Sequence, residues 1–206
     1  MIKVEGILVS GWESAIHGMR NPMNSWDKSD SLLCGNIDHP DVIIGENDLS
    51  LMKKLFHGGT EHRKFMRMVV VYMDITAPLY WWNEYDTYKV GTVANSSSTM
   101  HKIHFRDLTI DDFSHDHLDD SGIDALKCII SNLNRYRDKY KTSGGKADWY
   151  NMIQLLPNGY HWHRTVMLNY EVAATIIRQR TGHKLDEWNI FVDVLEELPY
   201  LMEIMK

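Results

Sequence analysis

The spacing of apolar and polar residues divides the chain into predicted strands and helices. Residues 1–10 alternate between the two kinds, which is typical of a half-buried strand. Residues 13–20 and 48–56 place their apolar side chains on one helical face, and the glycine pair 58–59 ends the second of these helices. The apolar, β-branched run within 65–75 predicts the central strand of a sheet.

Four further helices are predicted from residue 78 onward. Apolar residues at helical spacing predict helices over 78–88, 122–140, 169–180 and 185–205. Asn169 suits the N-cap of the third of these helices, because its side chain can accept a hydrogen bond from a free backbone N–H group. Polar stretches predict connections over 23–41, 90–98 and 101–120.

Composition fits an ordinary globular protein. The chain has 206 residues, 44% of them hydrophobic and 24% charged, and no linker divides it, so a single domain over 1–206 is expected. The formal net charge of -6 argues against a global basic field that would recruit nucleic acid. No signal-peptide or membrane-spanning pattern is visible, and Cys34 and Cys128 lie far apart. We therefore expect a cytoplasmic protein with reduced, structural thiols, Cys128 lying on the apolar side of its helix.

Three groups of residues could carry chemistry. The connection 101–120 is rich in possible metal ligands: His101, His104, Asp107, Asp111, Asp112, His115, Asp116 and His117. A solvated, charged loop is the competing interpretation, because no HExxH helix accompanies them. His161 and His163 alternate onto one side of a predicted strand, as a metal pair or as part of an ordinary strand. Arg178 and Arg180 end an apolar helix, where they favour the helix dipole or form a fork for phosphate or carboxylate.

The stretch 73–100 also has the makeup of a binding site. An apolar run leads into an aromatic block at 80–88, and the small polar run 95–99 follows. Hydroxyl and backbone donors mounted after a hydrophobic scaffold are a common arrangement for binding. The alternative is a buried strand, an aromatic core helix and a solvated serine loop.

The segment 169–190 resembles the C-terminal segment of flavin-dependent thymidylate synthases, the ThyX family. Asn169 falls on the family asparagine, Arg180 on the arginine that ends the helix, and 187–190 on the Gln-Trp-Glu-Ile step. Upstream, 155–157 resembles the family's Leu-Pro turn, and 15–20 resembles its Ala-Ala-Arg helix.

The family signature, Arg-His-Arg-x2-Ser-x-Asn-Glu-x-Ser-x-Arg-Tyr, falls without gaps on 87–100. Ser97 is identical, Lys89 keeps a positive charge and Thr92 keeps a hydroxyl. The signature is otherwise replaced, most notably at the following positions: Thr87, Tyr88, Asn95 and Thr99. Glu171 stands where the family has the arginine two residues after its asparagine. The resemblance is therefore to a divergent relative.

The resemblance implies an α+β fold, with an antiparallel sheet flanked by helices, and a homotetramer. It implies a transferase that holds FAD, binds dUMP, takes one carbon from methylenetetrahydrofolate and uses NADPH. On the matching positions, catalytic roles fall on Ser97 and Arg180. Nucleotide binding falls on Glu84, Lys89, Asn95, Ser97, Ser98 and Arg180. Flavin binding falls on Thr87, Tyr88, Val90, Asn169 and Thr175, with Trp81 and Trp82 packing beneath the flavin and no metal required.

The lost arginines leave the activity open. Other basic side chains could compensate for them: Arg20, Arg63, Arg67, His161 and His163. A modified pyrimidine or hydroxymethylation would suit the same scaffold, as would a noncatalytic protein that binds flavin or nucleotide. A metal-dependent hydrolase built on 101–120 is a third reading.

Overall fold

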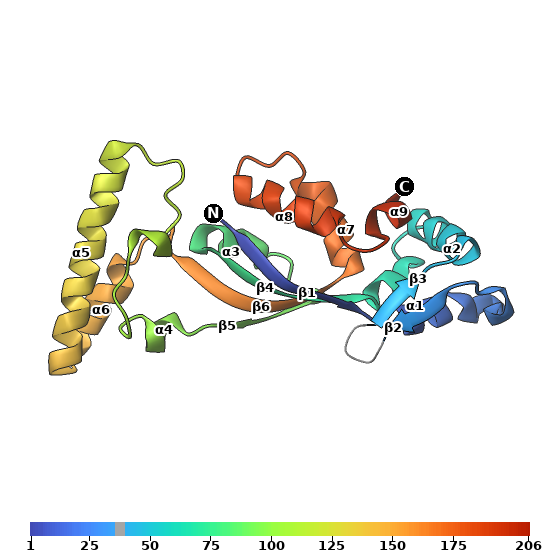
Figure 1. Ribbon diagram of the computed structural model, residues 1–206, viewed down its shortest axis with the longest axis horizontal. Helices are drawn as coiled ribbons and strands as arrows, with labels where there is room; N and C mark the ends of the chain where they lie inside the picture. The colour runs from blue at the N-terminus through green and yellow to red at the C-terminus, as the bar shows by residue number, and fades with distance from the viewer. Residues whose placement is uncertain (36–39) are drawn as a thin grey trace. The chain divides into compact units, whose positions relative to one another are not determined.

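The computed structural model describes residues 1–35 and 40–206, and it combines an antiparallel sheet with flanking helices (Figure 1). The larger sheet has four strands in the order β1-β4-β6-β5: β1 (Lys3–Ser10), β4 (Val70–Pro78), β6 (His161–Asn169) and β5 (Thr92–Ser96). A smaller sheet pairs β2 (Leu32–Gly35) with β3 (Pro40–Ile43), in a register that places Leu32 opposite Ile43. The predicted α+β class is confirmed.

The chain folds as two compact units. Unit 1 consists of residues 1–3, 75–87 and 95–164. Unit 2 consists of residues 4–74, 88–94 and 165–206. The candidate site residues fall on both units.

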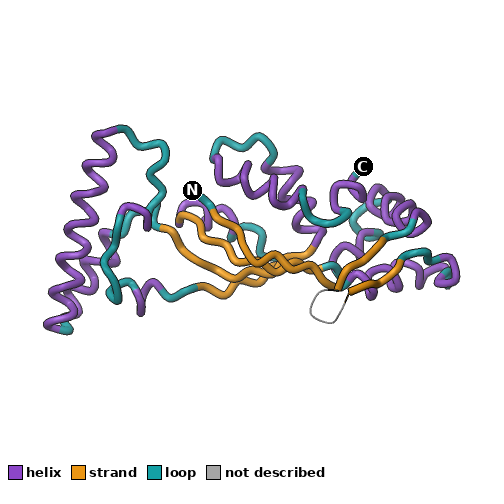
Figure 2. The backbone as a smooth tube through the Cα atoms, in the orientation of Figure 1, coloured by secondary structure: helices purple, strands orange, loops and turns teal. Residues whose placement is uncertain are grey.

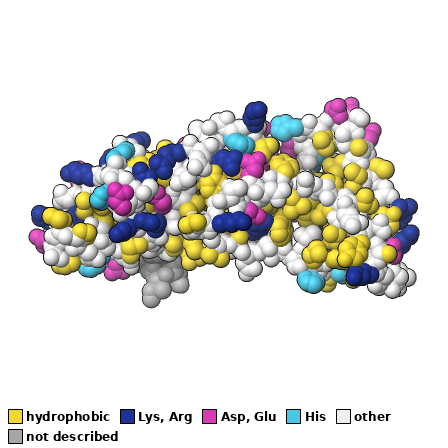
Figure 3. Space-filling model, turned by 180° about the vertical axis from the view of Figure 1, so that it is seen from behind, with side chains coloured by type: hydrophobic (Ala, Val, Ile, Leu, Met, Phe, Trp, Pro, Cys, Tyr) yellow, Lys and Arg dark blue, Asp and Glu magenta, His cyan; other side chains and the backbone are white. Residues whose placement is uncertain are grey.

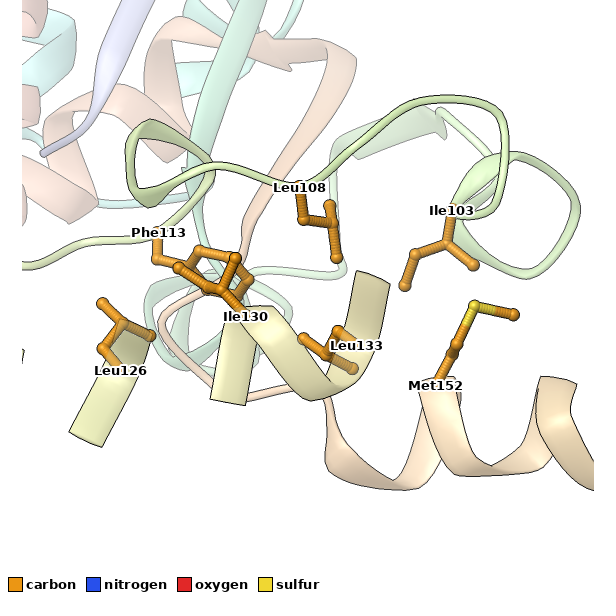
Figure 4. Packing of buried hydrophobic residues seen from close by; sticks show 7 residues of the cluster. All are labelled: Ile103, Leu108, Phe113, Leu126, Ile130, Leu133 and Met152. Atoms are coloured by element: carbon orange, nitrogen blue, oxygen red, sulfur yellow. The ribbon is translucent and has the colours of Figure 1, made fainter. Parts of the chain in front are cut away.

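Unit 1 has its apolar core beside a pair of helices, α5 (Asp120–Ser143) and α6 (Lys146–Leu155). Figure 4 shows the buried side chains that meet there: Ile103, Leu108, Phe113, Leu126, Ile130, Leu133 and Met152. Helix α5 begins where the Asp119 side chain accepts from the Gly122 amide at 2.8 Å. It ends at Gly144, whose φ of 64° favours glycine.

The aromatic block also belongs to unit 1. Helix α3 (Leu79–Tyr85) follows Pro78 directly, and it buries Trp81, Trp82 and Tyr85. The Trp81 and Tyr85 rings stack with centroids 5.1 Å apart. Two further short helices complete the unit: α4 (Thr99–Lys102) and η4 (Ile110–Asp112).

Unit 2 is mostly helical. Its helices are α1 (Trp12–Arg20), η1 (Asn21–Met23), η2 (Trp26–Lys28), α2 (Glu46–His57), η3 (Arg63–Arg67), α7 (Tyr170–Arg180), α8 (Asp186–Glu196) and α9 (Leu201–Met205). Tyr170 lies at its centre, fully buried, with its ring edge-on to Trp12 at 5.1 Å and its hydroxyl donating to the carbonyl of Pro199 at 2.9 Å. No helix among the described residues is long and apolar enough to cross a membrane.

Several predicted elements are corrected by the structure (Figure 2). The predicted loop 90–98 contains strand β5, and the predicted loop 23–41 contains η2, β2 and the start of β3, while 36–39 lie outside the described residues. Strand β5 carries few of the alternating apolar residues that mark a half-buried strand, and all of its residues except the first are exposed, in keeping with that composition.

Three boundaries also differ. The predicted strand 65–75 is a 3-10 turn followed by β4, and the aromatic helix stops at Tyr85. The predicted helix 185–205 is broken into α8 and α9, because Pro199 supplies no N–H and Tyr200 adopts a φ of 61°. Cys128 is exposed on α5 rather than buried on its apolar side.

Candidate functional site

Arg180 organises a polar and aromatic cluster in unit 2. Its guanidinium carbon lies 4.4 Å from the centre of the Trp188 ring and 5.7 Å from that of Tyr88. Its Nε donates to the Tyr88 hydroxyl at 2.9 Å, and that hydroxyl donates to Oε1 of Gln179 at 3.0 Å. Nη1 lies 3.1 Å from Nε2 of His183. The half-buried guanidinium is therefore fixed in orientation by an aromatic ring against its face and by polar contacts at its nitrogens.

Local sequence explains why Arg180 sits there. Helix α7 begins at Asn169, whose Oδ1 accepts from the Val172 amide at 3.0 Å, as its N-cap position predicts. The helix then buries Ala173, Ile176 and Ile177, which fixes the direction in which its last turn presents Arg180. A cation in this turn also interacts favourably with the helix dipole.

The segment 88–94 packs against the start of the same helix. Gly91 has a φ of 84°, and a Cβ built on it would lie 2.6 Å from Nδ2 of Asn169. Only glycine fits this approach without displacing the asparagine. Tyr88 therefore reaches Arg180 from a segment that packs closely against Asn169.

The other residues expected around a flavin are placed differently. Asn169 is only 8% exposed, and its carbonyl oxygen is used by the helix cap. Thr175 donates its hydroxyl to the Glu171 carbonyl at 2.9 Å. Val90 is 90% exposed, and Lys89 is exposed beside it. The structure thus brings Tyr88 and Arg180 together. The side-chain carbonyl of Asn169 and the hydroxyl of Thr175 instead form hydrogen bonds within α7.

The remaining predicted residues lie in unit 1. Thr87 donates its hydroxyl to the Glu84 carbonyl at 2.7 Å. Ser97 is exposed, and its backbone is fixed at both ends: its N–H donates to the His163 carbonyl at 3.0 Å, and its carbonyl accepts from the Trp162 indole at 2.6 Å. Ser98 caps α4 by accepting from the His101 amide at 3.3 Å. Asn95 is exposed on β5.

Arg164 in unit 1 has a well-defined environment, although its place in the sequence predicted no role for it. It is 7% exposed, and its guanidinium carbon lies 4.2 Å from the ring centres of both Trp82 and Trp162. Its two terminal nitrogens donate to the Asp86 carboxylate at 2.6 and 3.3 Å. The alternation that places Trp162 and Arg164 on the same side of β6 was the available signal. Asp86 was not recognisable as the partner, because it lies far away in sequence.

The side chains expected to compensate for missing arginines have other partners. Arg20 is buried against Asp48 at 2.7 Å. Arg63 donates to the Phe56 carbonyl at 2.5 Å and pairs with Glu171 at 3.5 Å. The others bond as follows: Arg67 to the Thr60 carbonyl, His161 to Ser114 and His163 to Thr76.

The acidic and histidine-rich connection is held by ion pairs. Asp107 pairs with Arg137, Asp112 with Arg106, and Asp116 with the Met1 amino group. The hydrogen bonds from Arg106 and Thr109 lower the pKa of Asp112 below its usual value, although burial alone would raise it. Within the described ranges, no group of three or more acidic, histidine or cysteine side chains is placed to hold a metal ion.

Comparison with known proteins gives the fold. No family profile and no curated protein matches the sequence. Solved structures do match: ThyX from Helicobacter pylori with FAD and dUMP superposes with a TM-score of 0.71 at 14% identity, over 100% of this chain and 97% of that one. PolB from Streptomyces cacaoi, a UMP/dUMP methylase bound with 5-Br dUMP, gives a TM-score of 0.65 at 11% identity, over 100% of this chain and 93% of that one.

These matches confirm the resemblance at the level of fold. The protein has a divergent ThyX-like fold, shared along its whole length with a flavin-dependent thymidylate synthase and a nucleotide methylase. At identities of 11% and 14%, the matches carry the fold and leave the chemistry to be argued from the residues.

Proposed function

We propose that the protein binds a deoxyuridine monophosphate-type nucleotide and transfers a one-carbon unit to it from methylenetetrahydrofolate, with FAD as cofactor and NADPH as reductant. The observation that carries this proposal is the Arg180 cluster, set in a fold that ThyX shares over the full chain. A homotetramer of a single 1–206 domain in the cytoplasm is the accompanying expectation.

Arg180 suits a pyrimidine nucleotide because its position is fixed before the ligand arrives. Trp188 supports one face of the guanidinium, and Tyr88 orients Nε. A planar guanidinium held in this way can donate to a uracil carbonyl or a phosphate with little loss of side-chain entropy. The exposed ammonium of Lys89 adds positive charge on the same segment as Tyr88.

The side chains around Arg180 in unit 2 also suit parts of FAD. The Tyr88 ring and the exposed Val90 offer aromatic and apolar contact, and Arg180 and Lys89 offer charge to a pyrophosphate. When bound, FAD supplies the hydride for the reaction. Asn169 and Thr175 would support this site through helix α7, since their oxygens already form hydrogen bonds within it.

In unit 1, the proposed nucleotide ligands are Glu84, Asn95, Ser97 and Ser98, with Thr87 proposed for the flavin. Ser97 is the best placed of these, because its backbone is fixed while its side chain remains exposed. Its proposed catalytic part is to orient the nucleotide by hydrogen bonding, since a serine without a base is a weak nucleophile.

A second candidate is a noncatalytic protein that binds the same ligands. Glu171 favours it, because this carboxylate, which stands where the resemblance expects an arginine, is half-buried and paired with Arg63 at 3.5 Å. Such a pair gives no cation to a phosphate. Turnover distinguishes the candidates: protein incubated with dUMP, methylenetetrahydrofolate, FAD and NADPH yields a nucleotide gaining a methyl or hydroxymethyl mass, or it returns dUMP unchanged.

The binding site itself is tested by a pair of arginines on one helix. Arg178 is exposed near the end of α7, and it serves as the control for Arg180. We expect Arg180→Ala to weaken dUMP binding by about 10- to 100-fold, the loss of one charged hydrogen-bond donor, and Arg178→Ala to leave it within about twofold. Calorimetry gives the affinities, and the shift of the bound-flavin absorption on adding dUMP gives a second readout. Equal affinities for the two variants would refute the assignment of Arg180.

A further inference from the structure

Unit 2 contains a cavity away from Arg180 that no role yet explains. It has a volume of about 170 Å³ and is lined by Glu13, Ile16, His17, Arg20, Trp26, Ser29, Ser31 and Leu33. These residues come from α1, from η2 and from the segment that leads into β2, and Figure 1 labels α1 and β2. An apolar cavity of about 150 Å³ can hold one benzene ring, so this volume suits a ligand of one six-membered ring.

The floor of the cavity is built from buried charge. Arg20 is 4% exposed and Asp48 is fully buried, with Nε of Arg20 donating to Oδ1 at 2.7 Å. The second carboxylate oxygen accepts from the hydroxyls of Ser29 and Ser31, both at 2.7 Å, and from the amides of Asp30 and Ser31, both at 3.1 Å. Both carboxylate oxygens of Asp48 therefore already accept hydrogen bonds, and the hydroxyl protons of Ser29 and Ser31 are not available to a ligand.

Arg20 retains donors for a ligand. Its Nη1 donates to the Ser25 carbonyl at 3.2 Å, while Nη2 has no acceptor in the part of the chain that the structure describes. A buried guanidinium with unused N–H groups at a cavity is a preformed donor for a carbonyl oxygen.

The wall of the cavity is aromatic and fixed. The rings of His17 and Trp26 are nearly parallel, at 13°, with centroids 5.7 Å apart. The Trp26 indole donates to Oδ1 of Asn21 at 2.8 Å, which holds the ring in place. Ile16 and Leu33 add apolar surface. A planar ring would make extensive contact with this wall.

The charge at the cavity selects against an anion. The charge of Arg20 is cancelled by Asp48, and the exposed Glu13 adds a carboxylate that forms no ion pair among the described residues. Glu13 and Arg20 lie seven residues apart on α1, so they project from the same face of the helix about two turns apart.

We propose that this cavity binds a neutral, planar, six-membered heterocycle that carries a carbonyl at one end and a ring N–H at the opposite end. The carbonyl accepts from Nη2 of Arg20, the N–H donates to the carboxylate of Glu13, and the ring lies against Trp26. This site uses none of the residues proposed for the nucleotide, so it stands or falls independently of that function.

The probe is 4-pyridone, which has this arrangement of groups, and benzoate is the anionic comparison of similar size. Both ligands are titrated at the same pH. The Trp26 indole N–H resonance, assigned by its loss in Trp26→Phe, reports where the ligand binds. We expect 4-pyridone to shift this resonance in a saturable way and to bind at least about tenfold more tightly than benzoate.

Two first-turn glutamates supply matched variants, because Glu13 opens α1 and Glu46 opens α2, both exposed. Glu13→Gln should weaken 4-pyridone binding by about fivefold to tenfold, since a charged acceptor becomes neutral, and should narrow the preference over benzoate. Glu46→Gln should change neither. No saturable shift with 4-pyridone, a preference for benzoate, or equal affinities in the two variants would overturn the proposal.

Discussion

Replacing Asp48 with asparagine tests the buried ion pair on which the N-terminal half of unit 2 is built. The side chain keeps its shape but loses its charge, so Arg20, only 4% exposed, loses its buried counter-ion. The new amide group also donates where four donors now converge on Oδ2. Breaking a buried pair in this way costs about 3–5 kcal/mol of unfolding free energy.

Urea denaturation followed by circular dichroism measures the cost. With an m value of about 3 kcal/mol/M, a loss of about 4 kcal/mol lowers the midpoint by about 1.3 M. Asp27→Asn, an exposed aspartate in η2, is the control and should stay within about 0.5 kcal/mol. In an Arg20→Met background, Asp48→Asn should cost clearly less, because no buried cation remains.

The pH dependence gives an independent check. Burial alone would raise the pKa of Asp48, but hydrogen bonds from Ser31, Ser29 and Arg20 lower it below its usual value. A lowered pKa contributes stability that is complete above the unfolded pKa of about 3.9 and is lost as the pH falls through the folded value. The gap between wild type and Asp48→Asn should therefore close below about pH 4. A cost under about 1 kcal/mol at pH 7, or a gap that persists in acid, would refute this account.

Three further predictions concern other residues. Arg164→Lys should lower the unfolding free energy by about 2–4 kcal/mol, because lysine keeps the charge but loses the paired hydrogen bonds and the stacking between two indoles; a change below about 0.5 kcal/mol in urea would contradict it. Gly91→Ala should cost about 2–3 kcal/mol because of its φ of 84° and the nearby Asn169, and Gly144→Ala, strained but open, about 1 kcal/mol; thermal midpoints would show this order, and equal shifts would disprove the crowding. Burial lowers the pKa of His161, so the unfolded chain takes up the proton more readily and stability should fall between about pH 7 and pH 5. His161→Asn should flatten that slope, and an unchanged slope would exclude His161 as its cause.

The sequence was most informative where local signals agree with packing. Asn169 was predicted as an N-cap and is one, and the apolar face of α7 is buried as its spacing indicates. Helix α5 was also predicted, because its apolar period continues over several turns.

Elements set by long-range contacts were missed. Strand β5 carries small polar residues, and its pairing at the edge of the sheet depends on β6, which is distant in sequence. The break between α8 and α9 depends on Tyr200, whose hydroxyl accepts from the Ile44 amide and donates to the Val42 carbonyl, both at 3.3 Å. The partners of Arg20 and Arg164 were hidden for the same reason.

The charged residues also illustrate the limit of composition: it gives the net charge but not which charged side chains are buried. The net charge of -6 was read as a lack of any global basic field, and Figure 3 shows cationic and anionic side chains interspersed on the face it presents. Composition could not show that Arg20, Arg137 and Arg164 are buried and paired with carboxylates. These arginines contribute to the fold rather than to the surface potential.

The contact between Gly91 and Asn169 has a consequence for how this sequence can evolve. One asparagine starts α7 and also closes the space beside Gly91, so a side chain at position 91 requires a shorter residue at position 169 as well as a change in the backbone. Among relatives, the two positions should covary: a residue with a Cβ at 91 should accompany a shorter N-cap, such as serine, at 169. Sequence change in the 88–94 segment is thereby linked to the start of the helix that carries Arg180. Substitutions that alter ligand preference through position 91 should therefore be accompanied by a substitution at position 169.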